Sequence, residues 1–174
     1  MSYTPPLAAL SAGLLALRLV VGLSMAAHGT QKLFGWFGGP GLSGTAGFFQ
    51  ALGFHPGRLL AAVAAVTEML SGLLIALGLL GPLGPALMIS VMLVAMSVHW
   101  SNGYFAQAQG IELSVLYVAS ALSLAFTGPG AYSLDALCGL GALSSPSIAL
   151  LAVTVGALGG AANLARRHAP AHAS

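Results

Sequence analysis

The sequence contains very little charge. Among its 174 residues, five are Lys or Arg and three are Asp or Glu, so that charged residues make up 5% of the chain. A soluble domain carries about 25% charged residues, and so few charges cannot keep a surface of this size in water. Intrinsic disorder is excluded as well, because disordered chains combine low hydrophobicity with high charge. The basic residues form no cluster that could follow a phosphate backbone, so we expect no nucleic-acid partner.

Cysteine is nearly absent too. Cys138 is the single cysteine, which excludes an intrachain disulfide and a CxxC redox or zinc motif. The patterns of phosphate-binding loops, dinucleotide-binding folds, serine hydrolases and HExxH metalloproteases are missing. The chain also has no detectable inverted repeat, which argues against a self-contained secondary transporter. Any chemistry must therefore come from a small number of polar residues.

Hydrophobic residues, in contrast, make up 57% of the chain, and the mean hydropathy is +0.94. They gather in five apolar stretches that are long enough, or nearly so, to cross about 30 Å of hydrocarbon. Residues 1–17 contain no Lys or Arg, so the first stretch is interpreted as a retained helix rather than a signal peptide. The sequence predicts an all-α, polytopic transmembrane helical bundle with spans at about 7–27, 59–80, 83–98, 111–127 and 148–165.

The predicted organisation has three parts. A four-helix membrane core occupies residues 1–145 and includes an interfacial segment at 35–54. Within that segment, 43–52 is expected to form a short helix that ends at Gly53. An additional transmembrane helix follows at 146–167, and the tail at 168–174 is predicted to be disordered.

The basic residues predict the orientation in the membrane. With five spans, the connection after the first helix and the end of the last helix lie on the same side. Lys32, Arg58, Arg166 and Arg167 all flank that side. Because cytoplasmic flanks are enriched in Lys and Arg, we expect this side and the C-terminus in the cytoplasm and the N-terminus outside.

Two charges fall inside the predicted spans. Arg18 and Glu68 each cost roughly 2.5–3.5 kcal/mol at the centre of a bilayer if unpaired. If the first helix ends at His28 and the second begins at Arg58, both charges lie about 15 Å from the same membrane face. We therefore predict an Arg18–Glu68 ion pair, which either serves a function or only holds two helices together.

Further polar residues are predicted to surround the mouth of a channel that leads to this pair. Histidine and glutamate could transfer protons there. Histidines at one membrane face could also bind haem, and together with Glu112 a metal ion, but the motifs are too loose and we expect neither. Lys32 could instead extend only to the lipid headgroups. The residues of the predicted mouth are His28, Lys32, His99, Asn102 and Glu112.

Several motifs occur in a fixed order along the chain. They are RLVVG at 18–22, HGTQKLFGWFGG at 28–39, TAGFF at 45–49, EMLSG at 68–72, HWSNG at 99–103 and GPGAYSLD at 128–135. Through these motifs the chain resembles, over about residues 12–138, the DoxX family of integral membrane proteins. The fifth helix lies beyond the four-helix core of that family.

The resemblance implies an inner-membrane subunit of a redox assembly whose electrons pass to or from a quinone. A partner protein would have to supply the electrons, since the chain contains no obvious carrier. On this interpretation a quinone headgroup lies in the polar pocket, with proton transfer by Glu68, His28 and His99. The residues assigned to quinone binding are Arg18, Lys32, Glu112, Asn102 and Trp36.

Two other functions remain open at this stage. The first is a non-catalytic membrane anchor or assembly protein of a redox or oxidative-stress complex. The second is a permease for a small molecule or for protons. The sequence does not decide whether the chain is itself catalytic or forms a homo-oligomer.

Overall fold

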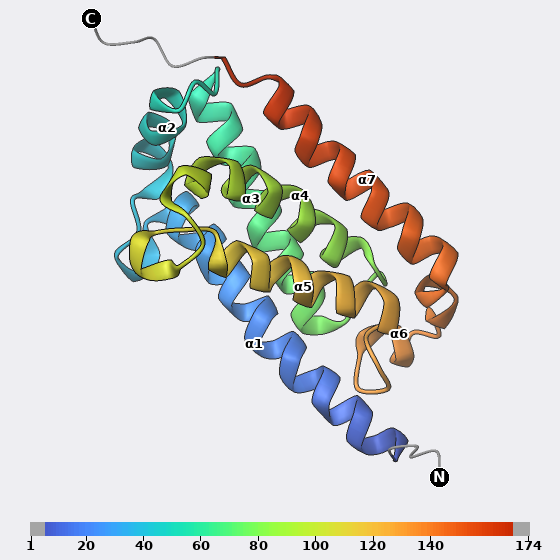
Figure 1. Ribbon diagram of the computed structural model, residues 1–174. Helices are drawn as coiled ribbons and strands as arrows, with labels where there is room; N and C mark the ends of the chain where they lie inside the picture. The colour runs from blue at the N-terminus through green and yellow to red at the C-terminus, as the bar shows by residue number, and fades with distance from the viewer. Residues whose placement is uncertain (1–5, 169–174) are drawn as a thin grey trace, which may run out of the picture.

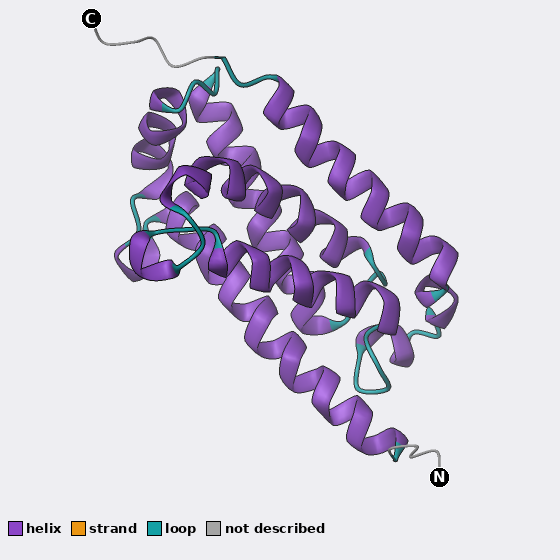
Figure 2. Cartoon of the chain, viewed as in Figure 1, coloured by secondary structure: helices purple, strands orange, loops and turns teal. Residues whose placement is uncertain are grey.

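The protein is a bundle of helices, seen in a computed structural model that describes residues 6–168 (Figures 1 and 2). The predicted all-α, polytopic membrane bundle is confirmed. Four helices are long and apolar enough to cross a membrane, and α5 is a shorter apolar helix of 16 residues. The main helices of the bundle are α1 (Leu7–Phe34), α3 (Gly57–Leu77), α4 (Leu83–His99), α5 (Glu112–Thr127) and α7 (Pro146–Ala165). The short elements are η1 (Trp36–Gly38), α2 (Gly41–Ala51), η2 (Trp100–Asn102), η3 (Ala106–Ala108), α6 (Leu134–Leu137) and η4 (Gly141–Ser144).

The first helix is longer than the sequence predicted. Polar residues follow Ala27, but α1 continues through them and ends only at Phe34. The stop is Gly35, which adopts φ +76° and donates its backbone N–H to Gln31 O at 3.2 Å. This left-handed conformation is easy only for glycine, which is why glycine ends many helices at this position. The polar residues after Ala27 end the apolar stretch of the sequence, but they do not end the helix.

Small residues allow α1 and α3 to pack closely as an antiparallel pair. A Cβ atom on Gly22 would lie 2.6 Å from both Ala76 N and Gly72 O, so that only hydrogen fits there. A Cβ atom on Gly29 would lie 2.6 Å from Ala65 O. Membrane helices associate through such small-residue contacts because lipid provides no hydrophobic drive between them. We call this contact the α1–α3 seam, and it fixes which residues of the two helices lie opposite one another.

The last helix joins the bundle by a similar contact. Gly160 of α7 lies against Ser90 of α4, where an added Cβ would be 2.8 Å from Ser90 O. Between the helices, the buried core contains large apolar side chains from α1, α3, α4 and α5. They include Met25, Ile75, Met88, Ile89, Met92, Tyr117 and Leu124.

The two ends of the bundle carry different elements, and we name them after these. The α2 face contains α2 and the C-terminal ends of α1, α4 and α7; the α6 face contains α6 and the start of α1 (Figure 1). At the α2 face, His168 N donates to Gly53 O at 3.0 Å, and Arg167 Nε donates to Leu52 O at 2.8 Å. The predicted location of the first connection and the end of the last helix on one side is therefore confirmed. Of the predicted disordered tail, 169–174 lies outside the described residues.

Candidate functional site

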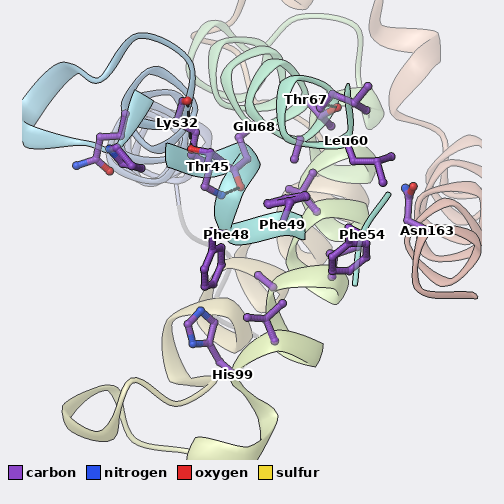
Figure 3. A pocket seen from close by; sticks show the side chains of 18 of the residues that line it. Lys32, Thr45, Phe48, Phe49, Phe54, Leu60, Thr67, Glu68, His99 and Asn163 are labelled. Carbon is purple, nitrogen blue, oxygen red and sulfur yellow. Dashed lines mark hydrogen bonds and ion pairs between the residues drawn. The ribbon is translucent and has the colours of Figure 1, made fainter. Parts of the chain in front are cut away.

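A cavity of about 810 Å³ lies at the α2 face, between α2, α3 and α4 (Figure 3). Near their connecting turn, α3 and α4 are in contact, since a Cβ on Gly84 would lie 3.0 Å from Leu74 Cβ. Toward the α2 face, the cavity lies between them. Most of its wall is apolar, as is typical of pockets that hold small organic molecules. The apolar lining includes Phe48, Phe49, Phe54, Leu60, Val63, Val91, Val94 and Val98.

One end of the cavity holds an ion pair whose carboxylate is buried. Lys32 Nζ donates to Glu68 Oε1, and Thr45 lies beside the pair (Figure 3). The Glu68 side chain is 3% exposed and that of Lys32 is 31% exposed. Thr45 Oγ1 donates to Gly41 O at 2.8 Å and to Lys32 O at 3.3 Å, which ties α2 to the last turn of α1. A carboxylate is thus held inside a largely apolar space.

The second oxygen of that carboxylate has no partner. Glu68 Oε2 is buried and makes no hydrogen bond to any of the described residues. A buried, unpaired oxygen of a charged group costs at least about 1–3 kcal/mol. Such a group within a ligand-sized cavity marks the place where a bound molecule could donate a hydrogen bond.

The predicted Arg18–Glu68 ion pair is wrong. Arg18 lies against Gly78, because a Cβ on Gly78 would be 2.7 Å from Arg18 Cζ. Gly78 follows Glu68 by about 15 Å along the helix axis. The prediction had ended the first helix at His28, whereas α1 continues to Phe34 and the α1–α3 seam places Glu68 beside the last turns of α1. Lys32 therefore takes the position opposite Glu68.

Arg18 instead donates to two backbone segments at the α6 face. Its Nε donates to Ile75 O at 3.1 Å, its Nη2 to Ala76 O at 3.2 Å and Tyr132 O at 2.9 Å, and its Nη1 to Pro129 O. The side chain is 2% exposed. Arg18 thus ties the end of α3 to the loop after α5, far from the cavity.

Asp135 completes this second polar cluster. Its carboxylate accepts hydrogen bonds from Leu80 N at 2.8 Å and Gly81 N at 2.6 Å, in the turn between α3 and α4. Asp135 N donates to Gly78 O at 3.0 Å. Asp135 therefore acts as a capping residue of that turn, and the helix cap of α6 itself is Ser133. This cluster holds the α6 face together.

The structure brings only some of the predicted site residues to the cavity. Lys32, Glu68 and His99 line it, and His99 lies below Phe48, apart from the ion pair (Figure 3). The ring of His28 instead packs edge-on against Tyr117, at 6.2 Å between centroids.

The remaining predicted site residues lie outside the cavity lining. Glu112 Oε2 accepts from Ala106 N at 2.8 Å, and Asn102 Nδ2 donates to Gln109 O at 3.1 Å, so both organise the loop between α4 and α5. Trp36 is 56% exposed in η1. Across residues 6–168, no three His, Cys, Asp or Glu side chains are grouped so that they could hold a metal ion.

Several residues of the cavity were missed from the sequence. The short helix at 43–52 was predicted at nearly its observed position, but as an interfacial segment rather than as a cavity wall. It supplies Thr45, Phe48 and Phe49. Asn163, a single amide within apolar α7, was a usable signal, because a polar residue in a membrane span marks a candidate functional position.

A double-mutant cycle tests which cation is paired with Glu68. We expect Lys32→Met and Glu68→Gln to be coupled by at least about 1 kcal/mol, since residues in one buried pair are not additive. Arg18→Met and Glu68→Gln should add within about 0.5 kcal/mol, because the two side chains share no partner. The measurement is the unfolding free energy in detergent. Coupling of Arg18 rather than Lys32 to Glu68 would contradict the observed pairing.

Comparison with known proteins gives one match. The family model for DoxX matches residues 13–100, which is half of the chain and spans α1 to α4. The matched region contains the ion pair, the α2 wall and His99, but not α5 or α7. No curated protein and no solved structure matches the chain.

Proposed function

Because the chain belongs to the DoxX family of membrane proteins, we propose that its cavity binds the headgroup of a quinone within a membrane redox assembly. The observation that carries the proposal is the Lys32–Glu68 pair at one end of an apolar cavity. An apolar pocket with a few convergent polar groups is the usual form of a site for a small organic molecule.

The residues present fit the chemistry of a quinone. Its ring is flat and apolar, and Phe48 and Phe49 from α2 offer aromatic surfaces on the cavity wall. Its two carbonyl oxygens accept hydrogen bonds, and an ammonium group carries three donors, of which Glu68 Oε1 takes one from Lys32. The volume of about 810 Å³ lies within the range of about 300–1,000 Å³ found for ligand sites.

Reduction of a quinone to a hydroquinone consumes two electrons and two protons. We propose that a partner subunit carrying a redox centre supplies the electrons, and that this chain positions the ring and handles protons. Lys32 would hold a ring oxygen. Histidine is the residue class best suited to exchange protons near neutral pH, and His99 lines the same cavity. Glu68 keeps Lys32 in place through their ion pair.

The binding test uses the purified protein in detergent and a short-tailed benzoquinone. We expect saturable binding to the wild type and at least about tenfold weaker binding to Lys32→Met/Glu68→Leu, which removes both charges together. Glu112→Gln is the matched control, because it removes a carboxylate outside the cavity. Its affinity should equal that of the wild type.

Two results would overturn the proposal. If the folded wild type binds no quinone but co-purifies with redox proteins, the chain is a membrane anchor. If the protein alone moves a solute or protons across proteoliposomes and binds no quinone, it is a permease.

We further propose that the α2 face lies in the cytoplasm of a cell whose inner membrane holds the protein. The flanking cations Lys32, Arg58, Arg166 and Arg167 support this orientation. Cys138, the only cysteine, is exposed and follows α6 at the opposite face. It is therefore a built-in reporter of orientation.

A membrane-impermeant maleimide should label Cys138 in intact cells. The control is Ser101→Cys in a Cys138→Ser background, because Ser101 is exposed at the α2 face. This cysteine should react only after the cells are opened. The reverse pattern would place the α2 face outside.

A further inference from the structure

A residue that lines the cavity carries a hydrogen-bond acceptor that the described part of the protein does not use. Glu68 Oε1 accepts from Lys32, while Glu68 Oε2 is buried and has no partner in the described part of the chain. A carboxylate has no hydrogen to donate, so only a donor can satisfy this oxygen. Glu68 itself lines the cavity. A ligand with a hydroxyl or an N–H group at this end of the cavity would therefore make a hydrogen bond that a ligand without one leaves unmade.

A donor lies directly beside this acceptor. Lys32 Nζ carries three N–H groups, and its only hydrogen bond within residues 6–168 is the one to Glu68 Oε1. The ion pair thus offers a donor and an acceptor side by side. A single hydroxyl group can use both, because its oxygen accepts while its hydrogen is donated.

Building on the proposed function, we infer that the cavity distinguishes the two redox states of its ligand and binds the hydroquinone more tightly than the quinone. A quinone carbonyl can accept from Lys32 but leaves Glu68 Oε2 without a partner. A hydroquinone hydroxyl can accept from Lys32 and donate to Glu68 Oε2. The two ligands have nearly the same shape and apolar surface, so this hydrogen bond is the main difference between them.

We expect the affinity for the hydroquinone to be about tenfold higher than that for the quinone, because hydrogen bonds to charged groups are stronger than those between neutral groups. A site that binds the reduced form tenfold tighter raises the midpoint potential of the bound two-electron couple by about 30 mV. The cavity would then make a bound quinone a better acceptor of electrons from a partner. Reduction itself consumes two electrons and two protons, and the preference concerns only the binding of its product.

The experiment compares three ligands of one ring and tail under anaerobic conditions. They are a short-tailed benzoquinone, its hydroquinone, and the dimethyl ether of that hydroquinone, which keeps the oxygens but cannot donate. Wild-type protein should bind the hydroquinone about tenfold tighter than the other two. In Glu68→Gln the preference should disappear, and in the control Glu112→Gln it should persist.

The outcomes separate this inference from the proposed function. If no member of the series binds, the proposed function fails. If the quinone and hydroquinone bind the wild type equally, or the dimethyl ether binds as tightly as the hydroquinone, the proposed function stands and the inference is overturned. A preference that persists in Glu68→Gln overturns it as well.

A second measurement compares ligands on the wild-type protein, with Glu68 left in place. The infrared carboxylate stretching bands of wild-type protein should shift on addition of hydroquinone and stay in place on addition of the dimethyl ether. Carbon-13 labelling of glutamate restricts the signal to Glu68 and Glu112, the two glutamates of the chain. In Glu112→Gln, Glu68 is the one glutamate left in the sequence, so the same band shift in that variant assigns it to Glu68. Identical bands with both ligands would contradict the inference.

Discussion

Replacement of Arg18 by methionine is expected to lower the free energy of unfolding by about 3–5 kcal/mol, the range for breaking a buried charge pair. The guanidinium donates to Ile75 O, Ala76 O, Pro129 O and Tyr132 O, and methionine replaces none of these bonds. Ile75 O keeps its bond from Gly78 N, whereas the other three carbonyls lose the guanidinium as a donor. Replacing Arg18 also removes the free-energy cost of burying a charge, and this gain offsets part of the loss but not all of it.

Asp135 increases the expected effect, because this acidic residue belongs to the same cluster: Arg18 lies against Gly78, and Gly78 O accepts from Asp135 N at 3.0 Å. Without Arg18, a carboxylate that is 1% exposed would keep its two backbone hydrogen bonds but lose its counter-charge. The turn between α3 and α4 and the loop after α5 should therefore loosen together. The structural consequence is local to the α6 face.

Thermal unfolding in detergent measures the total effect, and hydrogen exchange measures where it falls. We expect faster exchange for the amides of Leu80 and Gly81 in Arg18→Met. Arg166→Met is the matched control, since Arg166 is exposed at the end of α7 and should change little. Quinone binding should survive in any folded Arg18→Met protein, because Arg18 does not line the cavity. If Arg18→Met and Arg166→Met lowered the unfolding temperature by the same amount, Arg18 would have no special role.

The sequence predicted the helices well, because the features that determine them are local. Apolar length, together with glycine and proline at the turns, placed α4 at 83–98 against the observed Leu83–His99. The same reasoning placed α5 at 111–127 against Glu112–Thr127. A span must satisfy its own backbone hydrogen bonds, so its limits depend little on distant residues.

The pairing of charges could not be predicted in the same way, because it depends on the register between helices. Because the end of α1 was predicted too early, the wrong residue of α1 was predicted to pair with Glu68 of α3. The register is set by the fit of Gly22 against Gly72 and Ala76, and that fit involves backbone atoms of both helices. No pattern within one helix reveals it.

The cavity could not be predicted from the sequence, for a related reason. Its walls come from α1, α2, α3 and α4, from the loop residues Pro40, Phe54 and Gln109, and from Asn163 of α7, which are distant in the chain. Lys32, Glu68 and His99 stand out in the sequence as polar residues in an apolar context, and all three line the cavity. The sequence could not show that His28 turns instead toward Tyr117.

The α1–α3 seam leads to the other prediction with a large effect. We expect Gly22→Leu to lower the free energy of unfolding by more than about 3 kcal/mol or to prevent folding, because overpacking of this size exceeds the usual 1–3 kcal/mol. Its Cβ would lie 2.6 Å from backbone atoms of Gly72 and Ala76, which cannot move aside as a flexible side chain could. Gly13→Leu is the matched control on the same helix, since no atom lies within 4 Å of an added Cβ there.

The milder change Gly22→Ala connects the seam to the site. Even a methyl group forces α1 and α3 apart, and Lys32 and Glu68 lie on these two helices. In a folded Gly22→Ala protein we therefore expect weaker coupling between Lys32 and Glu68 in the double-mutant cycle, together with weaker quinone binding. Gly13→Ala should leave both unchanged. If Gly22→Ala destabilises the protein but leaves the coupling and the binding at wild-type values, the seam holds the bundle together without positioning the ion pair.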